Sequence, residues 1–466
     1  MEAIVLGAGP CGLTAAWELA KRGVNVTVVE KDDVVGGLCK TVRHGDYRFD
    51  LGGHRFISKD EELVEQVKTL MGNSLLRRSR KSCIRFKDRQ FDYPINIPNI
   101  LSQSSARDCF RFATGYLASA AGFYHSKAPK SSFEAWVDKS FGRPLNEYFF
   151  KPYTEKLWGI SAGELSDEWA GQRISLLNAK DAILKSLSIT REKPRTYAVH
   201  YLYPKHGIGQ IFTAMADDIK RMGGKIITGF KPVEFKISES KIEGVVIENE
   251  TGEGKILTAS KFLSTIPINE LVKLLDPGSE EILGYRSLRF LNITLNGLTN
   301  LSDNTWMYTP EADIIMTRIQ EPKRRSPLSA PEGKTSVMLE IPCLYMDKTW
   351  TMPDGELLDI VLADLKTLGL DLRPHVDEVF SSYAQNAYPI LKLGSAGHVK
   401  SLRKKVARFT NIATAGRQGL FKYIFMDTAM LMGRQWARNI LGESARRVTI
   451  DTIHSEAKLL ESESMV

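Results

Sequence analysis

The sequence predicts an α/β fold in which a parallel sheet is interrupted by a helical layer and a β-rich layer. The chain opens on a strand, a glycine turn, a helix and a second strand, "IVLGAGPCGLTAAWELAKRGVNVTVVE" (Ile4 to Glu30), the pattern of a parallel sheet covered by helices. Helical patterning fills the region from about Ile100 to Leu187, and β-branched alternation fills Tyr285 to Pro389. Two short strands, "KFLSTIP" and "NIATAG", are predicted to return to the first sheet.

The turn between the first strand and the helix, which is predicted over Leu13 to Arg22, has G-x-G-x-x-G spacing. Such glycines allow close backbone approach to a pyrophosphate, and the helix N-terminus attracts its charge. Glu30 stands 18 residues after Gly12, where a carboxylate can accept both hydroxyls of a ribose. A glycine turn without a ligand is the alternative, but this order of elements favours a Rossmann-type dinucleotide site. Five turn residues are assigned to the dinucleotide: Gly7, Gly9, Pro10, Cys11 and Gly12.

A second glycine pair indicates which dinucleotide binds. Gly36-Gly37-Leu38 follows Glu30 by six residues and resembles the extended fingerprint of glutathione-reductase-type FAD proteins. The resemblance implies FAD, with the glycine pair beside the pyrophosphate and with Glu30 and Lys31 at the cofactor. It also implies that Val233, in the hairpin-like stretch Lys225 to Thr258, clamps the adenine with its backbone.

The composition is that of a globular protein with room for two or three domains. The 466 residues are 43% hydrophobic and 25% charged, with a net charge of +8. A basic balance suits nucleic acid, anionic lipid or an anionic small substrate. No nucleic-acid motif accompanies the densest basic run, "RRSRKSCIRFKDR" (Arg77 to Arg89), so no nucleic-acid partner is expected. Cys83, Ile84 and Phe86 interrupt this run, which favours a solvated hairpin.

The cysteines and the hydropathy of the sequence argue against a metal-binding, a disulfide-rich or a membrane-spanning protein. The five cysteines are scattered without a C-x-x-C pair, so no metal site and no disulfide framework are expected. Cys11, inside the phosphate turn, suits a reducing compartment. The apolar N-terminus is interpreted as a strand rather than a signal peptide, and no run of about 18 apolar residues could span a membrane. A cytoplasmic location is therefore expected.

The insertions predict a discontinuous domain organisation. Ser131 and Glu134 match a capping box that would start one helix of the helical part. A last helix is expected from about Thr428. The predicted parts are an FAD-binding domain (1–95, 200–284 and 405–442), a helical insertion (96–199), a β-rich substrate domain (285–404) and a polar tail (443–466).

Four longer motifs follow one another along nearly the whole chain. They are "FDLGGHRFISKDEELVEQV", "FFKPYTEKLWG", "TRIQEPK" and "GRQGLFKYIFMD". Together they resemble UDP-galactopyranose mutase and its relatives, in a superfamily that also contains protoporphyrinogen oxidase and the amine oxidases. A further piece, "YLYPKHGIGQIF", is shared with protoporphyrinogen-oxidase-like relatives. No uracil-binding segment can be matched, so the resemblance favours a diphosphate-linked substrate more than galactose in particular.

The resemblance implies a mutase-like reaction on a nucleotide sugar, as in polysaccharide biosynthesis. Reduced flavin would attack the anomeric carbon through N5 and displace the nucleotide, and the flavin-bound sugar would reclose with the other ring size. NAD(P)H is a candidate reductant. The alternative is an FAD-dependent oxidoreductase of the protoporphyrinogen oxidase and amine oxidase type, acting as an oxidase, dehydrogenase or desaturase. The sugar, the physiological reductant and the oligomeric state remain open.

The resemblance also assigns side chains to an anionic substrate. Arg318 and Arg173 match two phosphate-binding arginines, which suit pyrophosphate because the planar guanidinium pairs bidentately with phosphate oxygens. The alternatives are a surface arginine paired with Glu321 for Arg318, a helix-end salt bridge for Arg173, and core packing for Tyr153 and Trp158. The assigned substrate residues are Tyr153, Trp158, Arg173, Arg318, Tyr388 and Tyr423.

A last group of residues is assigned to the flavin ring. His54, after Gly53, matches a histidine that packs against the isoalloxazine, and it is counted with Arg318 and Arg173 as catalytic. A turn histidine with a structural role is the alternative. Met426 and Asp427 match a helix start whose backbone N–H groups face the flavin N1–O2 edge and favour the reduced form. Gly416 and Arg417 end the preceding strand and are assigned to the cofactor.

Overall fold

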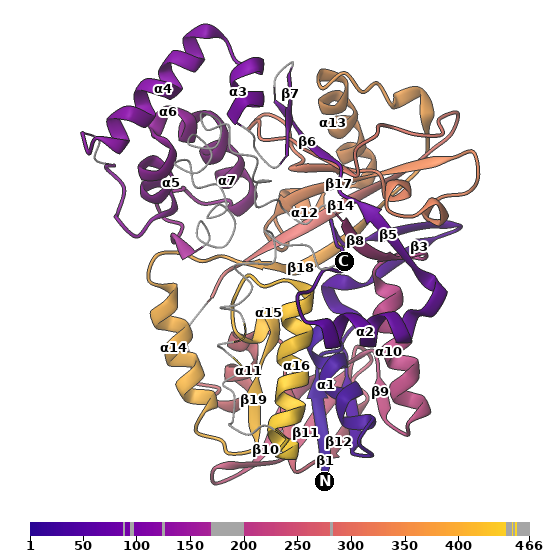
Figure 1. Ribbon diagram of the computed structural model, residues 1–466. Helices are drawn as coiled ribbons and strands as arrows, with labels where there is room; N and C mark the ends of the chain where they lie inside the picture. The colour runs from indigo at the N-terminus through magenta and orange to yellow at the C-terminus, as the bar shows by residue number, and fades with distance from the viewer. Residues whose placement is uncertain are drawn as a thin grey trace.

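The computed structural model describes residues 1–86, 89–93, 97–123, 126–168, 200–279, 283–443, 450 and 453. In Figure 1 a parallel sheet and its helices form the lower half, with a second large sheet above it on the right and a helical layer above it on the left. The predicted α/β class, with an inserted helical layer and a β-rich layer, is confirmed.

The lower half is built on a five-stranded parallel sheet in the order β19-β13-β1-β2-β9. Its strands are β1 (Glu2–Leu6), β2 (Asn25–Val29), β9 (Lys225–Ile227), β13 (Lys261–Ser264) and β19 (Ile412–Thr414). The central strand β1 is buried from Ala3 to Leu6, as expected for a parallel strand covered on both faces. The predicted return of "KFLSTIP" and "NIATAG" to the first sheet is confirmed, because β13 pairs with both β1 and β19.

Helices α1 (Pro10–Ala20), α2 (Glu61–Met71), α10 (Gly209–Arg221) and α16 (Met426–Leu441) gather beside this sheet (Figure 1). α1 begins three residues before the predicted start, because Pro10 suits a first helical turn, where no N–H is needed. α1 and α16 approach closely at Gly433, where an added Cβ would lie 2.1 Å from the Cys11 carbonyl oxygen. α16 also begins earlier than predicted, at Met426.

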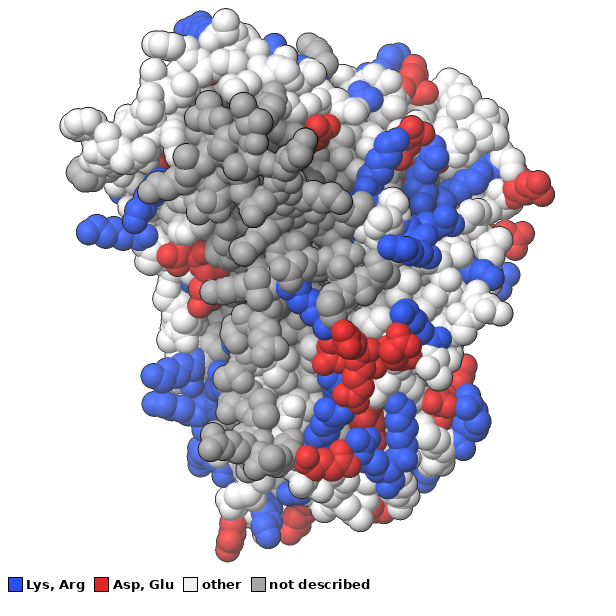
Figure 2. All heavy atoms as spheres, in the orientation of Figure 1, with Lys and Arg blue, Asp and Glu red and all other residues white. Residues whose placement is uncertain are grey.

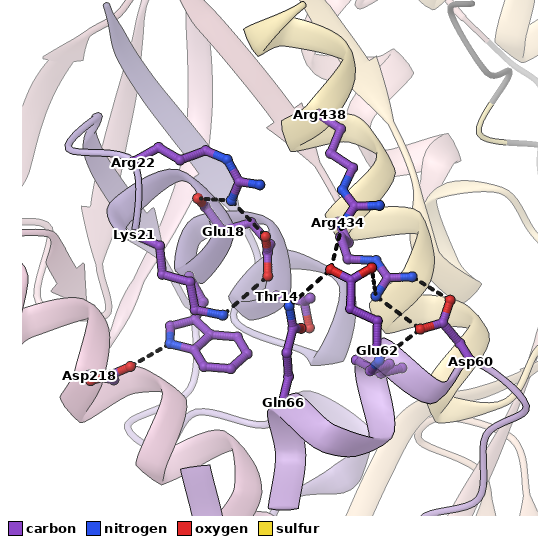
Figure 3. A network of polar contacts seen from close by, with 12 residues as sticks. Thr14, Glu18, Lys21, Arg22, Asp60, Glu62, Gln66, Asp218, Arg434 and Arg438 are labelled. Carbon is purple, nitrogen blue, oxygen red and sulfur yellow. Dashed lines mark hydrogen bonds and ion pairs between the residues drawn. The ribbon is translucent and has the colours of Figure 1, made fainter. Parts of the chain in front are cut away.

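A network of ion pairs fixes α16 against α2 (Figure 3). Asp60 caps α2 by accepting the backbone N–H of Leu63, and its two carboxylate oxygens also accept from Arg434 at 3.0 and 2.5 Å. Glu62 pairs with Arg434 at 3.3 Å and with Arg438 at 2.5 Å. Because Asp60 and Glu62 stand at the start of α2, these contacts set the position of α16 along the molecule.

Several smaller elements complete the lower half. The predicted hairpin region contributes β10, β11 and β12 to a three-stranded antiparallel sheet, with α11 after it. Two strand pairs, β3–β4 and β5–β8, lie toward the second sheet. The bounds are β3 (Thr41–His44), β4 (Tyr47–Asp50), β5 (Leu75–Ser79), β8 (His200–Pro204), β10 (Phe230–Ser238), β11 (Lys241–Asn249), β12 (Gly254–Thr258), α11 (Ile268–Leu275), α14 (Ser395–Val406) and α15 (Gly416–Gly419).

The upper right of the molecule is a seven-stranded sheet in the order β18-β14-β17-β16-β15-β6-β7 (Figure 1). Its bounds are β6 (Ser82–Phe86), β7 (Arg89–Asp92), β14 (Tyr285–Leu295), β15 (Trp306–Tyr308), β16 (Arg318–Gln320), β17 (Thr335–Cys343) and β18 (Val376–Pro389), with α12 (Lys348–Thr351) and α13 (Asp354–Thr367) beside it.

The basic run departs from expectation. β6 and β7 form a hairpin, but β6 also pairs with β15, and Cys83, Ile84 and Phe86 are buried. The predicted hairpin is confirmed and Lys81 beside it is exposed, but the apolar side chains that interrupt the run are not solvated, because they are part of the sheet's packing. The domain limits remain a prediction, although β6 and β7 pair with strands of the predicted β-rich part rather than with the parallel sheet.

Among the described residues, the helical layer contains α3 (Ile97–Gln103), α4 (Ala106–Ala120), α5 (Phe133–Phe141), α6 (Arg143–Leu145) and α7 (Lys151–Trp158). The residue that caps α5 is Ser132, which accepts the N–H of Ala135, rather than the predicted Ser131. Glu134 pairs with Lys151 instead of closing a capping box. Lys156 of α7 donates to two backbone carbonyls of the segment after β15, Thr309 and Glu311, each at 2.8 Å, and so ties α7 to the seven-stranded sheet.

Candidate active site

The glycine turn between β1 and α1 leaves room for close approach by a ligand. A Cβ on Gly12 would lie 2.0 Å from the carbonyl oxygen of Gly7, and one on Gly37 would lie 3.1 Å from the Cα of Gly9. The two glycine motifs are therefore packed against each other. At Gly9 an added Cβ would meet nothing within 4 Å. The N–H groups of the first turn of α1 lack helical acceptors, so this opening has donors for a phosphate.

Glu30 lies at the end of β2, beside this opening. It is 6% exposed, and its two oxygens accept the backbone N–H groups of Ala8 at 2.6 Å and Asp32 at 3.1 Å. Burial raises the pKa of this carboxyl group, and the two hydrogen bonds act in the opposite direction. Each oxygen keeps capacity for a second donor, so the carboxylate can also accept ribose hydroxyls. Lys31, next to it, is exposed, and Leu38 is half-buried.

Val233 is at an irregularity in β10. The register passes from Pro232 opposite Ile247 directly to Glu234 opposite Val246, so Val233 has no partner in the ladder. A bulged residue presents backbone groups that a regular strand would use for pairing. This geometry is compatible with the predicted backbone contact to an adenine.

A second glycine turn, Gly52-Gly53-His54, follows β4 and lies against the seven-stranded sheet. A Cβ on Gly53 would lie 2.5 Å from Nη1 of Arg318, and one on Gly52 would lie 3.6 Å from Oε2 of Glu340. Burial, with the positive charges of Arg417, Arg325 and Arg318, lowers the pKa of His54 to about 3. His54 is therefore a neutral imidazole at neutral pH.

The two faces of the seven-stranded sheet differ: one is apolar, whereas the other combines polar side chains with apolar ones that pack against Tyr47 and Phe49. One face carries apolar side chains of β14, β16 and β17 that pack with α13. Because side chains alternate along a strand, the residues between them point to the other face. There, cross-strand partners place Tyr308 opposite Arg318, and Arg318 opposite Glu340. A row of polar side chains thus crosses three adjacent strands on the face nearest Gly53.

Arg318 and Glu340 form the central ion pair of this row. Nη2 of Arg318 donates to Oε1 of Glu340 at 2.9 Å, and the side chains are 12% and 0% exposed. Burial disfavours the charge, but the attraction of Glu340, together with the neighbouring Tyr308, Tyr388 and Tyr153, outweighs burial and holds the pKa of Arg318 well above its ordinary value. Nε of Arg318 is buried and has no hydrogen-bond partner among the described residues. The alternative interpretation of Arg318, a surface arginine paired with Glu321, is therefore wrong, because Arg318 pairs with Glu340 and Glu321 pairs with Arg324.

Four predicted aromatic residues gather beside this ion pair. The hydroxyl of Tyr388 donates to the same Glu340 oxygen at 3.2 Å. The ring of Trp158 lies 5.8 Å from that of Tyr388 and 6.5 Å from that of Tyr423. Tyr153 is five residues before Trp158 on α7, and its ring centre is 5.9 Å from that of Tyr308. The structure therefore brings Tyr153, Trp158, Tyr388 and Tyr423 together around Arg318.

Arg417 contacts the rings of Tyr388 and Tyr423 as well as two backbone carbonyl groups. Its guanidinium donates to the carbonyls of Ile424, at 3.2 and 2.6 Å, and Ala387, at 3.2 Å. It also lies 4.8 Å from the ring centre of Tyr423 and 5.9 Å from that of Tyr388. These contacts favour a role in positioning the two tyrosines. Gly416, with φ of +80°, brings the chain against Cys11 of the phosphate turn.

The start of α16 places a buried carboxyl group at a helix N-terminus. Asp427 is 3% exposed, and burial raises its pKa to about 7, although Thr428 and Ser58 donate to it. Met426 beside it is also buried. In this first turn the backbone N–H groups of Asp427 and Thr428 donate to the Asp427 carboxyl group, and donation by this helix start to the flavin edge stays a prediction. The predicted Arg173 lies outside the described residues.

Three site residues were missed by sequence reasoning: Gln320, Arg325 and Glu340. Arg325 is fully buried and donates to Gln320, which in turn donates to Glu340, so these side chains continue the polar row beneath the glycine turn. A charged residue inside the apolar strand "TSVMLEIP" is the signal that could have identified Glu340. Among the described residues no cluster suited to a metal ion is found, and no helix there is long and apolar enough to cross a membrane.

Residues 10–441 match the family model described as flavin containing amine oxidoreductase. The chain belongs to this family. Its cofactor is FAD, and the packed glycine turns and the buried Glu30 fit the phosphates and ribose of that dinucleotide.

Two of the similar proteins are mutases. A crystal structure of reduced UDP-galactopyranose mutase superposes with a TM-score of 0.81 at 20% identity, covering 98% of both chains. A probable UDP-galactopyranose mutase of Klebsiella pneumoniae is 23% identical over 448 residues, covering 95% of this chain and 96% of that protein. The predicted likeness to this group is confirmed at the level of fold.

Other similar proteins are desaturases. A 1-hydroxycarotenoid 3,4-desaturase of Flavobacterium is 47% identical over 390 residues, covering 74% of this chain and 77% of that protein. A phytoene desaturase of Fusarium fujikuroi is 23% identical over 386 residues, covering 73% of this chain. The chain spans 65% of the length of that desaturase. Family membership alone therefore leaves the reaction open between mutase and oxidoreductase.

Proposed function

We propose that this flavoenzyme acts on a diphosphate-linked sugar, as a mutase that interconverts pyranose and furanose rings. The observation that carries the proposal is the buried Arg318–Glu340 pair, shared with the Tyr388 hydroxyl, beside Gly53 and His54. A buried arginine with a free edge suits an anion that arrives from solution, and a neutral substrate would not require it.

The side chains of this row have separable roles. Glu340 holds Arg318 by one nitrogen and leaves Nε for a phosphate oxygen. On substrate binding the Tyr388 hydroxyl would turn from Glu340 to the phosphate, and with the Tyr423 hydroxyl it would add donors without adding charge, which favours a diphosphate that must leave and return. The buried ring of Trp158 packs against Tyr388 and would help to keep water from this group. A low dielectric around the phosphate strengthens each of these contacts.

His54 and Asp427 would act on the cofactor side. FAD, when bound and reduced, would supply a nucleophilic ring nitrogen. The neutral imidazole of His54 leaves the site without an added positive charge there, and it can donate one hydrogen bond. Protonated Asp427 would not oppose negative charge on a reduced ring. Arg173 would add a second arginine to the phosphates.

Desaturation is the second candidate function, favoured by the 47% identity to the Flavobacterium carotenoid desaturase. Such a reaction removes two hydrogens and passes the electrons to an acceptor. An apolar polyene would make no use of the Arg318 guanidinium, so the two functions predict different consequences for this side chain.

The deciding experiment is incubation with UDP-sugars, under dithionite and under air, with the products separated by chromatography. A mutase isomerises its substrate only with reduced flavin and consumes no reductant per turnover. Arg318→Met should abolish this activity, while Arg77→Met, an exposed arginine on β5, should retain it. One-for-one reduction of an acceptor, unaffected by Arg318→Met, would replace the mutase proposal with the desaturase one.

A further inference from the structure

Helix α4 of the helical layer exposes large apolar side chains. Phe110, Leu117 and Phe123 are 70%, 64% and 85% exposed, and we refer to these three residues as the α4 patch. Phe110 and Leu117 are seven residues apart, on one helix face. The turn after α4 holds Phe123 close, since its N–H donates to the carbonyl of Ala118.

The opposite side of α4 packs against the rest of the helical layer. Phe112 is buried against Tyr148 and Phe149, and a Cβ on Gly115 would lie 2.4 Å from Pro144. The hydroxyl of Ser119 donates to the carbonyl of Asp138. The α4 patch therefore cannot be explained as an unfinished contact within the layer.

The charge around the patch is distributed unevenly. No charged residue occurs between Arg111 and Lys127. Exposed basic residues stand at both ends of this interval: Arg107, Arg111, Lys127 and Lys130. The acid of α4, Asp108, accepts a hydrogen bond from Ser105 and lies 3.9 Å from Arg111. The part of the molecule that carries α4 in Figure 1 is mostly free of charged side chains in Figure 2.

We propose that the α4 patch binds the surface of an anionic lipid membrane. Apolar side chains on a helix that lies in the plane of an interface enter the acyl boundary, while neighbouring basic residues bind acidic headgroups. A second copy of this chain fits less well, because two such faces would bring like charges together. This inference is independent of the proposed reaction.

The test is co-sedimentation of the full chain with vesicles of phosphatidylglycerol and phosphatidylcholine in equal amounts, and with phosphatidylcholine alone. We expect binding to the mixed vesicles that weakens as salt is added. The triple change Phe110→Ser, Leu117→Ser and Phe123→Ser should lower the bound fraction by about tenfold or more. Ile256→Ser on β12, 63% exposed at the far end of the molecule, is the matched control and should bind like the unchanged protein.

The basic flank is tested separately. Arg107→Ala and Arg111→Ala should each weaken binding to the mixed vesicles roughly fivefold, while Arg77→Ala should not. FAD content measures whether each variant is folded. Absent binding to the mixed vesicles, or equal binding by the triple variant, would overturn the proposal. So would sedimentation velocity that shows, without lipid, a dimer dissolved by the triple change.

Discussion

The molecule has two regions suited to an anion, and they differ in the kind of donor. We call the glycine turn between β1 and α1 the phosphate turn, and the polar residues around Arg318 and Glu340 the sheet-face row. At the phosphate turn the donors are backbone N–H groups. Gly7 and Gly12 have no room for a side chain because a Cβ there would clash with Thr265 and with the Gly7 carbonyl oxygen, and Gly9 leaves open space for a ligand. At Arg318 the donor is a charged side chain, buried and balanced by Glu340 from the next strand. A site of the first kind depends on space, whereas a site of the second kind depends on charge balance.

The largest effect is expected at Gly12, where the surrounding backbone leaves no room for a side chain. In Gly12→Ala the new Cβ would lie 2.0 Å from a backbone oxygen, which cannot move away as a flexible side chain could. We expect no yellow, FAD-containing protein to be recovered, as measured by flavin absorbance. Gly397→Ala in α14, where a Cβ meets nothing within 4 Å, is the control and should be neutral or slightly stabilising. Full flavin content in Gly12→Ala would show that the turn is not closely packed.

The two kinds of site were also unequally predictable from sequence. The glycine turn, Glu30 and the return strands depend on local spacing, and the sequence contains that spacing directly. Arg318 was found through a motif, but Glu340 was not, because its partnership depends on β16 pairing with β17 across 22 residues. The α5 cap was misplaced by one residue, because Ser131 and Ser132 are equivalent candidates by type. The pairing of β6 with β15 could likewise not be predicted from local sequence patterns, because the two strands are far apart in the chain.

The second-largest effect is expected from breaking the Arg318–Glu340 ion pair, which tests whether charge balance governs this site. Arg318→Met leaves the Glu340 carboxylate buried without its partner, which should cost about 3–5 kcal/mol of unfolding free energy. The double variant Arg318→Met with Glu340→Gln should recover most of that loss, because no isolated charge remains. Urea denaturation measures both. Affinity for a UDP-sugar should stay low in both variants. If the double variant were as unstable as the single one, packing rather than charge would govern this site.

A pH dependence should follow from the start of α16. Burial raises the pKa of Asp427 from 3.8 to about 7, so between these pH values the folded protein holds a proton that the unfolded chain has released. Its contribution to stability is complete below pH 4 and is lost as the pH rises to 7, at up to roughly 1.4 kcal/mol per pH unit. Asp427→Asn should flatten this slope in urea denaturation measured at several pH values. The exposed change Asp46→Asn should leave the slope unchanged, and an unaltered slope in Asp427→Asn would contradict the assignment.

The smallest effect concerns the clamp, the ion pairs of Arg434 and Arg438 with Asp60 and Glu62 that join α16 to α2. Arg434 is 7% exposed and holds both oxygens of Asp60, whereas Arg438 is 29% exposed and holds Glu62 alone. Arg434→Met should therefore cost about 1–3 kcal/mol of unfolding free energy, and Arg438→Met about 0.5 kcal/mol or less. Because the clamp fixes α16, whose first turn lies beside Ser58, Arg434→Met should also release FAD faster on dilution. Equal losses in the two variants would mean that α16 is held by its contact with α1 at Gly433 and not by these charges.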